Sequence, residues 1–201
     1  MALRSPSPRA WQRMLSGRRL DLLDPSPLDV EIEDVAHGLA RVARWNGQTL
    51  GDHIFSVAQH SLLVEAIAQT LRIDIPGRIA LCILLHDAAE YVIGDMISPL
   101  KVVVGDSYKG VEARVLTAVM IRFGLPPSAG KDVATLTKQA DIIAAHHEAV
   151  TLAGFAESEA AKYFGPLREL PRPLAGMLVP WTASEAKHRF LARFETLSKE
   201  L

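Results

Sequence analysis

The sequence has little cysteine. Cys82 is the single cysteine among 201 residues, so no disulfide can form within the chain. A lone thiol inside the apolar run 79–85 is typical of a buried side chain in a reducing compartment. The sequence also lacks any run of about 18 apolar residues, the length that crosses a bilayer, and it begins without the apolar stretch of a secretory signal. These absences predict a cytoplasmic protein.

A strong charge of either sign is missing as well. The chain has 22 basic and 23 acidic residues, for a net charge of −1. This balance indicates neither a nucleic-acid nor a membrane partner, so we expect a small-molecule ligand. The first 20 residues are the exception, because they are free of acids and contain Arg4, Arg9, Arg13, Arg18 and Arg19. This segment is interpreted as a flexible, solvated terminus or as a basic handle for an anionic partner.

Alternation of apolar and polar residues, which marks strands, is also absent from residue 29 onward. Apolar residues recur there at spacings of three and four, which predicts an all-α fold. We expect a partly irregular arm over 1–28 and a single helical domain over 29–201. Within it, 44–148 forms the core of the site and 153–201 a C-terminal helical extension. The expected helices cover residues 30–44, 52–71 (or 56–71), 78–93, 108–123, 131–152 and 184–197, with a loop over 94–105 and an irregular stretch over 165–180.

The segment 78–93 is apolar on nearly all sides, which predicts the central buried helix. Between residues 79 and 93 the charged side chains are His86, Asp87 and Glu90. In a helix these three residues lie on one narrow face. Burying each of these charges without a partner costs roughly several kcal/mol. The face therefore requires a metal ion or a basic partner.

Two further apolar helices each offer one matching group, His60 and Asp141. Taken singly, each is more typical of a core residue with a hydrogen bond or an ion pair. As an ordered set on three helices they predict a mononuclear metal site with the ligands His60, His86, Asp87 and Asp141. Two imidazoles and two carboxylates suit one divalent ion (Mn, Co, Fe, Ni, Zn or Mg) and can leave positions open for water and substrate.

The motifs LLHDAAE (84–90) and GDMISPLK (94–101) resemble those of the HD-domain phosphohydrolases, in particular the bacterial 5′-deoxynucleotidases of the YfbR type. The resemblance covers about residues 44–148. It implies an HD-type helical bundle and a hydrolase of nucleotide metabolism that releases phosphate from deoxyribonucleoside 5′-monophosphates, with a homodimer as the assembly. It further implies that Glu90 is a catalytic carboxylate and that Asp95 activates or positions the water.

The same resemblance implies four substrate contacts. Arg44 and Trp45 match a pair that contacts phosphate and deoxyribose, and Ser98 and Lys101 lie in a loop that matches the family's Thr-Pro-x-Lys. The residues alone leave alternatives open. Glu90 could instead orient His86 through a hydrogen bond, and Arg44 and Trp45 could be a helix cap and a core anchor.

Other functions compete with the nucleotidase. A different HD reaction, on a nucleoside triphosphate or a cyclic nucleotide, would need a similar site. A sensor that binds a nucleotide and metal without turnover would have no use for both Glu90 and Asp95, which argues against it. His146 and His147 suggest a second metal, but no histidine lies between Asp87 and Ala145, where extra ligands fall in two-metal relatives. We therefore expect both at the helix surface or the pocket edge.

Overall fold

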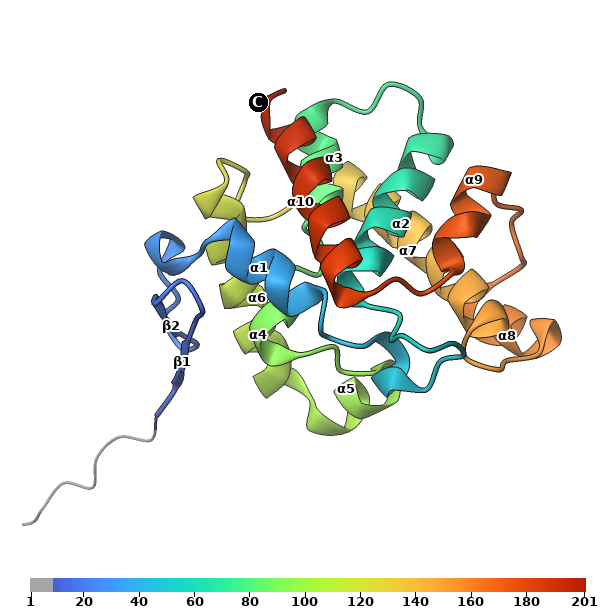
Figure 1. Ribbon diagram of the computed structural model, residues 1–201, viewed down its shortest axis with the longest axis horizontal. Helices are drawn as coiled ribbons and strands as arrows, with labels where there is room; N and C mark the ends of the chain where they lie inside the picture. Colours follow the sequence, from blue (N-terminus) through green and yellow to red (C-terminus); the bar gives the residue numbers. More distant parts are fainter. Residues whose placement is uncertain (1–8) are drawn as a thin grey trace, which may run out of the picture.

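The computed structural model describes residues 9–201, apart from the side chains of Ser98, Asp106 and Ser107. The chain is a bundle of helices with one small hairpin (Figure 1), which confirms the all-α prediction. The helices are α1 (Ile32–Leu39), α2 (Val57–Leu71), α3 (Gly77–Leu84), α4 (Glu90–Ile93), α5 (Ser98–Val104), α6 (Asp106–Arg122), α7 (Lys131–Thr151), α8 (Glu157–Phe164), α9 (Arg172–Ala175) and α10 (Ala183–Ser198). Short 3-10 turns are η1 (Pro27–Asp29), η2 (Arg44–Gly47) and η3 (Gly176–Leu178). Within residues 9–201, no helix has the length and apolar character that a membrane crossing needs.

The N-terminal segment forms a hairpin of β1 (Trp11–Arg13) and β2 (Arg19–Asp21), which pair antiparallel. Leu20 of β2 is fully buried in the core. The Ser16 backbone N–H, in the hairpin turn, donates to the Asp34 carboxylate of α1 at 3.0 Å. The described part of the expected arm is therefore attached to the bundle, while residues 1–8, with Arg4, lie outside the described residues.

Helix α2 lies at the centre of the bundle, between α3, α7 and α10 (Figure 1). Its first turn is capped by the Ser56 hydroxyl, which accepts a hydrogen bond from the Gln59 backbone N–H. Leu63 and Ile67 are buried along its length, and Phe55 is fully buried just before it. This packing holds the start of α2, where His60 lies, deep in the protein.

The prediction of one continuous helix over 78–93 is wrong, because the helix is interrupted near its middle. Helix α3 ends at Leu84, a turn covers 85–89, and α4 begins at Glu90, so His86 and Asp87 lie in the turn. There the backbone N–H of His86 bonds to the Ile83 carbonyl, three residues back instead of four. Such tightening at a helix end leaves the apolar periodicity unchanged, so the sequence pattern does not report it.

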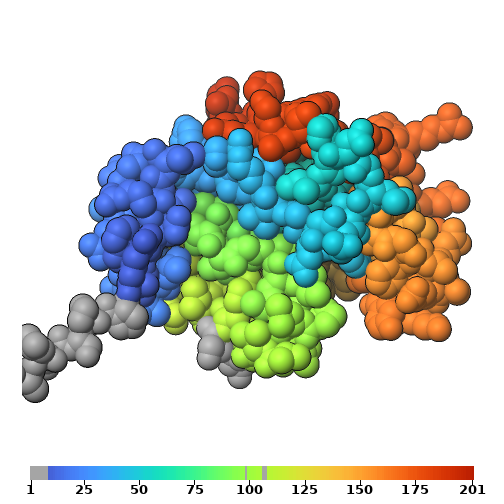
Figure 2. Space-filling model, turned by 60° about the horizontal axis from the view of Figure 1, so that its bottom comes forward, coloured from blue at the N-terminus to red at the C-terminus, as the bar shows by residue number. Residues whose placement is uncertain are grey.

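Other predicted boundaries also differ. The stretch 165–180, expected to be irregular, contains α9 and η3. The expected loop over 94–105 contains α5, whose first turn includes Pro99, a favoured residue at that position. The helix expected over 30–44 ends at Leu39, and the chain then turns through η2. Figure 2 shows one face of the molecule on which the η2 segment lies beside the α4–α5 segment.

Helices α1 and α4 pack closely against each other at Gly38. A Cβ at Gly38 of α1 would lie 2.5 Å from the Tyr91 carbonyl oxygen of α4. Only glycine therefore allows the two helices to pack at this distance.

Candidate metal centre

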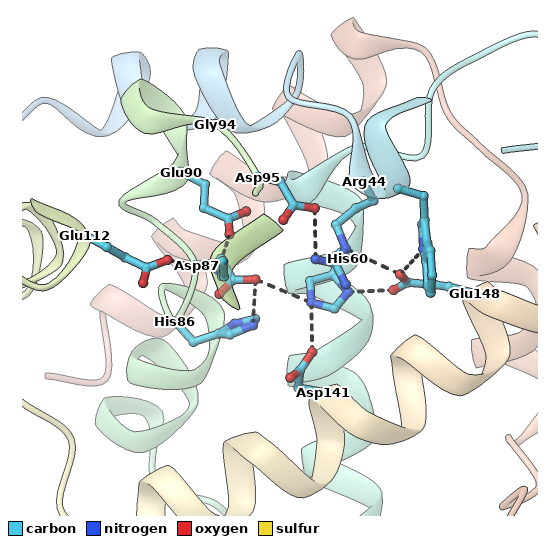
Figure 3. A network of polar contacts seen from close by, with 12 residues as sticks. Arg44, His60, His86, Asp87, Glu90, Gly94, Asp95, Glu112, Asp141 and Glu148 are labelled. Atoms are coloured by element: carbon cyan, nitrogen blue, oxygen red, sulfur yellow. Dashed lines mark hydrogen bonds and ion pairs between the residues drawn. The ribbon is translucent and has the colours of Figure 1, made fainter. Parts of the chain in front are cut away.

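The structure brings the four predicted ligands together (Figure 3). His60 comes from α2, His86 and Asp87 from the turn after α3, and Asp141 from α7. The His60 Nε2 lies 3.4 Å from Asp141 Oδ1 and 3.6 Å from Asp87 Oδ2, and the His86 Nε2 lies 3.1 Å from Asp87 Oδ2. Side-chain atoms of His60, His86 and Asp141 all fall within 4.8 Å of one another.

The two histidines direct the same ring nitrogen into this space. The Nδ1 of His86 lies 2.9 Å from the Ile83 carbonyl, and the Nδ1 of His60 lies 2.5 Å from a Glu148 carboxylate oxygen. Both partners are acceptors, so in the neutral ring each Nδ1 carries the proton and each Nε2 has a lone pair that can bind a cation. Both Nε2 atoms are buried and have no hydrogen-bond partner among the described residues. Two lone pairs facing two carboxylates repel unless a cation lies between them, so the residues fit a divalent metal ion.

The electrostatics of the cluster point the same way. Burial and Arg44 lower the pKa of His60, but Glu148 and Asp141 outweigh them and raise it to about 10, so Nε2 also takes up a proton unless another cation lies between it and the carboxylates. Burial raises the pKa of Asp87 and of Asp141, yet the neighbouring histidines hold both pKa values below their usual range. The carboxylates of Asp87 and Asp141 thus stay ionised, and positive charge between them is favourable.

Glu148 is a part of the site that the sequence analysis missed. Its side chain is fully buried, and besides His60 it accepts hydrogen bonds from Trp45 Nε1 at 2.9 Å and Arg44 Nε at 3.4 Å. The partners Arg44 and His60 outweigh the effect of burial and lower the pKa of Glu148 to about 2. Glu148 follows Asp141 by seven residues, which is two helical turns, and this spacing was the available signal.

Arg44 and Trp45 reach Glu148 from an unusual turn. Trp45 and Asn46 have φ values of 56° and 51°, in the left-handed region that side chains disfavour, and Gly47 follows at 74°. Trp45 packs between the rings of Phe155 and Phe164, with centroids 5.7 and 6.2 Å away. The turn is thus held by aromatic packing on one side and by a buried carboxylate on the other.

Glu90 and Asp95 lie on the opposite side of the cluster from Asp141 (Figure 3). Asp95 accepts a hydrogen bond from Arg44 at 3.0 Å. Glu90 is buried, its Oε1 lies 3.8 Å from Lys101 Nζ, and its Oε2 has no partner among the described residues. Burial, Asp87 and Asp95 raise the pKa of Glu90 to about 9, so its carboxyl group can hold a proton near neutral pH.

Lys101 lies beside Glu90 and is held by α6. Its ammonium donates to Glu112 at 3.1 Å and lies 5.6 Å from the ring centre of Tyr108. The Tyr108 hydroxyl donates to the Gly94 carbonyl at 2.9 Å, next to Asp95. The side chain of Ser98, the other predicted contact in this segment, lies outside the described residues.

The open alternatives can now be compared with the geometry. The hydrogen bond at the His86 Nδ1 goes to Ile83, so Glu90 does not orient His86 in the way considered above. Arg44 and Trp45 are anchored, as the structural alternative expected, but their anchor is Glu148, the hydrogen-bond partner of His60. The surface position expected for His146 is wrong, because its side chain is 2% exposed, with its ring centre 6.3 Å from that of Phe164. His147 is bonded through Nε2 to the Arg168 carbonyl, away from the cluster.

Comparison with known proteins identifies the family to which the chain is similar. The model of the YfbR-like 5′-deoxynucleotidases matches residues 35–159. An uncharacterized protein of Rhodobacter capsulatus is 52% identical over 194 residues, which cover 96% of this chain and 98% of that protein. The protein YfdR of Escherichia coli, also uncharacterized, is 29% identical over 171 residues, or 85% of this chain and 86% of YfdR. The match spans the helices that carry the clustered residues.

Proposed function

The chain belongs to the family of YfbR-like 5′-deoxynucleotidases, and we propose that it releases phosphate from deoxyribonucleoside 5′-monophosphates at a single divalent metal ion. Family membership supports a metal-dependent phosphohydrolase of the HD superfamily. The observation that carries the specific proposal is the pair of buried Nε2 atoms facing Asp87 and Asp141, next to a carboxyl group and a lysine. The proposed ligands are His60, His86, Asp87 and Asp141.

Each neighbouring residue has a role that its contacts suggest. A divalent ion in this set would lower the pKa of a bound water and offset charge on a phosphoryl oxygen. Asp95, fixed by Arg44, can accept a hydrogen bond from the attacking water and align it. Glu90, buried with one oxygen unpartnered, can hold a proton and deliver it to the leaving ester oxygen.

The predicted substrate contacts surround this centre. Lys101 can contact a phosphate oxygen while its other N–H bonds stay directed at Glu112 and Glu90. Arg44 has five N–H donors and uses two of them on Asp95 and Glu148, so a phosphate contact remains open to it. Trp45 and Ser98 complete the proposed set.

A phosphate-release screen tests the proposal. The metal-loaded protein is offered nucleoside mono-, di- and triphosphates, cyclic nucleotides and simple phosphomonoesters. We expect 2′-deoxyribonucleoside 5′-monophosphates to be turned over with the highest kcat/KM. Preference for a triphosphate or a cyclic nucleotide would show a different HD reaction, and nucleotide binding without any turnover would show a sensor.

Glu90→Gln separates catalysis from binding. Because the amide cannot transfer the proton, we expect kcat to fall by about 10²-fold or more while metal content and substrate affinity stay near wild type. Wild-type turnover by Glu90→Gln would contradict the role. Loss of metal, with the rate restored by excess metal, would show that Glu90 supports the metal site instead.

A further inference from the structure

The hairpin of β1 and β2 presents two different faces. Leu20 of β2 is fully buried, and Met14, the residue after β1, packs against the same core. Side chains alternate along a strand, so Trp11 and Arg13 of β1 and Arg19, the cross-strand partner of Arg13, lie on the opposite face. The hairpin lies at one edge of the molecule, at the other end from α8 (Figure 1). The bundle therefore covers one face of the hairpin and leaves Arg13 and Arg19 of the other exposed.

Three guanidinium groups surround one indole on the exposed side. The Cζ atoms of Arg9, Arg19 and Arg13 lie 4.4, 4.6 and 5.5 Å from the ring centre of Trp11. Arg9 Nε also donates to the Trp11 carbonyl at 3.1 Å, and Arg13 Nη1 donates to the Gly17 carbonyl at 2.8 Å. We call these four residues, Arg9, Trp11, Arg13 and Arg19, the outer face of the hairpin. The ring attracts the cations and the carbonyls orient two of them, so the remaining N–H groups are available to a ligand.

The positive charge of the outer face is not neutralised by the described residues. None of its three arginines forms an ion pair there, whereas Arg18, on the covered side, pairs with Glu31 at 2.8 Å. Asp21, the one acid within residues 9–21, accepts hydrogen bonds from two backbone N–H groups of the following turn and interacts electrostatically with Arg19. The outer face therefore keeps an excess of positive charge.

The arrangement of two of these arginines is unfavourable without a ligand. Arg13 and Arg19 are paired directly across the two strands, and like charges in that position destabilise a β-ribbon. The contacts with the indole offset part of the repulsion. An anion between the two guanidinium groups would remove it, because such groups form strong charge-assisted hydrogen bonds with phosphate or carboxylate oxygens. The outer face thus has the features of a site for a negatively charged partner.

The chemistry of the outer face favours one kind of anionic partner. A lipid surface is bound by several apolar side chains, but within residues 9–21 the exposed large apolar side chain is Leu15 in the turn, and guanidinium groups cover the ring of Trp11. An acidic peptide supplies carboxylates without flat rings. A single-stranded nucleic acid supplies phosphates for the N–H groups and bases that stack on guanidinium planes. From Arg9 to Arg13 an extended strand spans about 13 Å, which is long enough for more than one phosphate.

We propose that the outer face of the hairpin, with Arg9, Arg13 and Arg19 held around Trp11, binds single-stranded nucleic acid through its phosphate groups. A duplex fits less well, because the bundle covers the other face and keeps the hairpin from entering a groove. The inference goes beyond the proposed nucleotidase function and does not depend on the metal cluster. The net charge of −1 gave no sign of such a partner, because the acids that balance these arginines lie elsewhere in the chain. Few phosphates are contacted, so binding is weak and strongly dependent on salt.

The test measures fluorescence anisotropy of a labelled oligodeoxythymidylate with the metal-loaded full chain at several salt concentrations. The probe has hydroxyl groups at both ends, so it carries no phosphomonoester for the proposed active site. A double variant with Arg13→Gln and Arg19→Gln removes two guanidinium groups of the outer face. Arg189→Gln is the matched control, because Arg189 is an exposed arginine of α10 that lies over another indole, with its Cζ 4.2 Å from the ring centre of Trp181.

The expected results are a loss of affinity and a weaker salt dependence. Each phosphate contact with a single strand contributes about −0.7 to the slope of log affinity against log salt, so we expect a slope of about −2 for three arginines and about −0.7 for the double variant. At low salt the double variant should bind about tenfold or more weakly, while Arg189→Gln matches the wild type. Thermal unfolding and metal content should equal those of the wild type, because Arg13 and Arg19 are exposed and repel each other.

Other outcomes overturn the inference. Absence of oligonucleotide binding by the wild type, equal binding by the double variant, or an equal loss in Arg189→Gln would show that the outer face is not the site. Tighter binding of a duplex than of the single strand would contradict the proposed partner. Binding of phosphatidylglycerol vesicles or of polyglutamate in place of the oligonucleotide would assign the face to a membrane or to an acidic protein. If the wild type binds the oligonucleotide as expected but releases phosphate from no nucleotide, the proposed function fails and this inference stands.

Discussion

Replacement of Glu148 by glutamine should weaken metal binding although Glu148 does not face the cluster. One carboxylate oxygen accepts from His60 Nδ1 at 2.5 Å, and the other accepts from Trp45 at 2.9 Å and Arg44 at 3.4 Å. All three partners are donors. A glutamine has one oxygen and one NH₂ group, so it satisfies one side and presents a donor to the other.

The contacts indicate which way the glutamine amide would turn. Trp45 and Arg44 together offer two donors, one of them charged, so the amide oxygen should turn toward them. The NH₂ group then faces His60, whose Nδ1 must become the acceptor and whose proton must move to Nε2. A protonated Nε2 cannot bind a metal ion. Loss of such an outer partner typically weakens metal affinity by about 10–100-fold, which is roughly 1.4–2.7 kcal/mol.

The assay is a chelator competition with the purified protein, with urea unfolding as a check on the fold. Glu195→Gln is the control, because Glu195 is exposed on α10 and far from α2 and α7 in sequence. We expect the control to match the wild type in both measurements. Metal binding by Glu148→Gln as tight as that of the wild type would show that Glu148 does not set the tautomer of His60.

Three further predictions follow from the same structure. His86→Ala or Asp87→Ala should lower the metal content from about one ion per chain to near zero, measured by elemental analysis, because each removes a proposed ligand; full loading would contradict the set. Arg44→Ala should raise KM more than it lowers kcat in steady-state assays and should destabilise the fold by about 1–3 kcal/mol in urea, because Asp95 and Glu148 lose a donor. Gly38→Ala should destabilise the fold by roughly 1–3 kcal/mol, because its Cβ would lie 2.5 Å from the Tyr91 carbonyl; unchanged stability would show that α4 moves freely.

The fold class and the clustering of the site were predictable for a definite reason. Spacings of three and four report which face of a helix is buried, so the helical bundle follows from periodicity. Charged groups in apolar helices are costly unless they meet, and His60, His86 and Asp141 do meet. Residue type is read directly from the sequence, and burial follows from the apolar pattern around each charged group.

The finer features depend on interactions that periodicity does not carry. The break after Leu84 arises from a local change in hydrogen bonding. The left-handed conformation of Trp45 could not be predicted either, because such a conformation is normally indicated by a glycine and position 45 is a tryptophan. Glu148 bonds to His60 only because α2 and α7 pack side by side, although the two residues are 88 positions apart in the sequence. Long-range partners of this kind become visible only with the packing of the helices.

The strained turn at Trp45 connects several of these features of the site. Left-handed conformations at two successive non-glycine residues cost about 1–3 kcal/mol each, and they persist only where the surroundings impose them. The indole is fixed by Phe155 and Phe164 and by its hydrogen bond to Glu148, while the adjacent Arg44 bonds to both Glu148 and Asp95. A relaxed turn would direct these two side chains differently and would leave Glu148 buried with fewer donors. The strained turn therefore places two donors against Glu148, the carboxylate that bonds to His60 Nδ1, and one of these donors, Arg44, also bonds to Asp95. One turn thus connects the proposed metal ligands to the proposed water-aligning group.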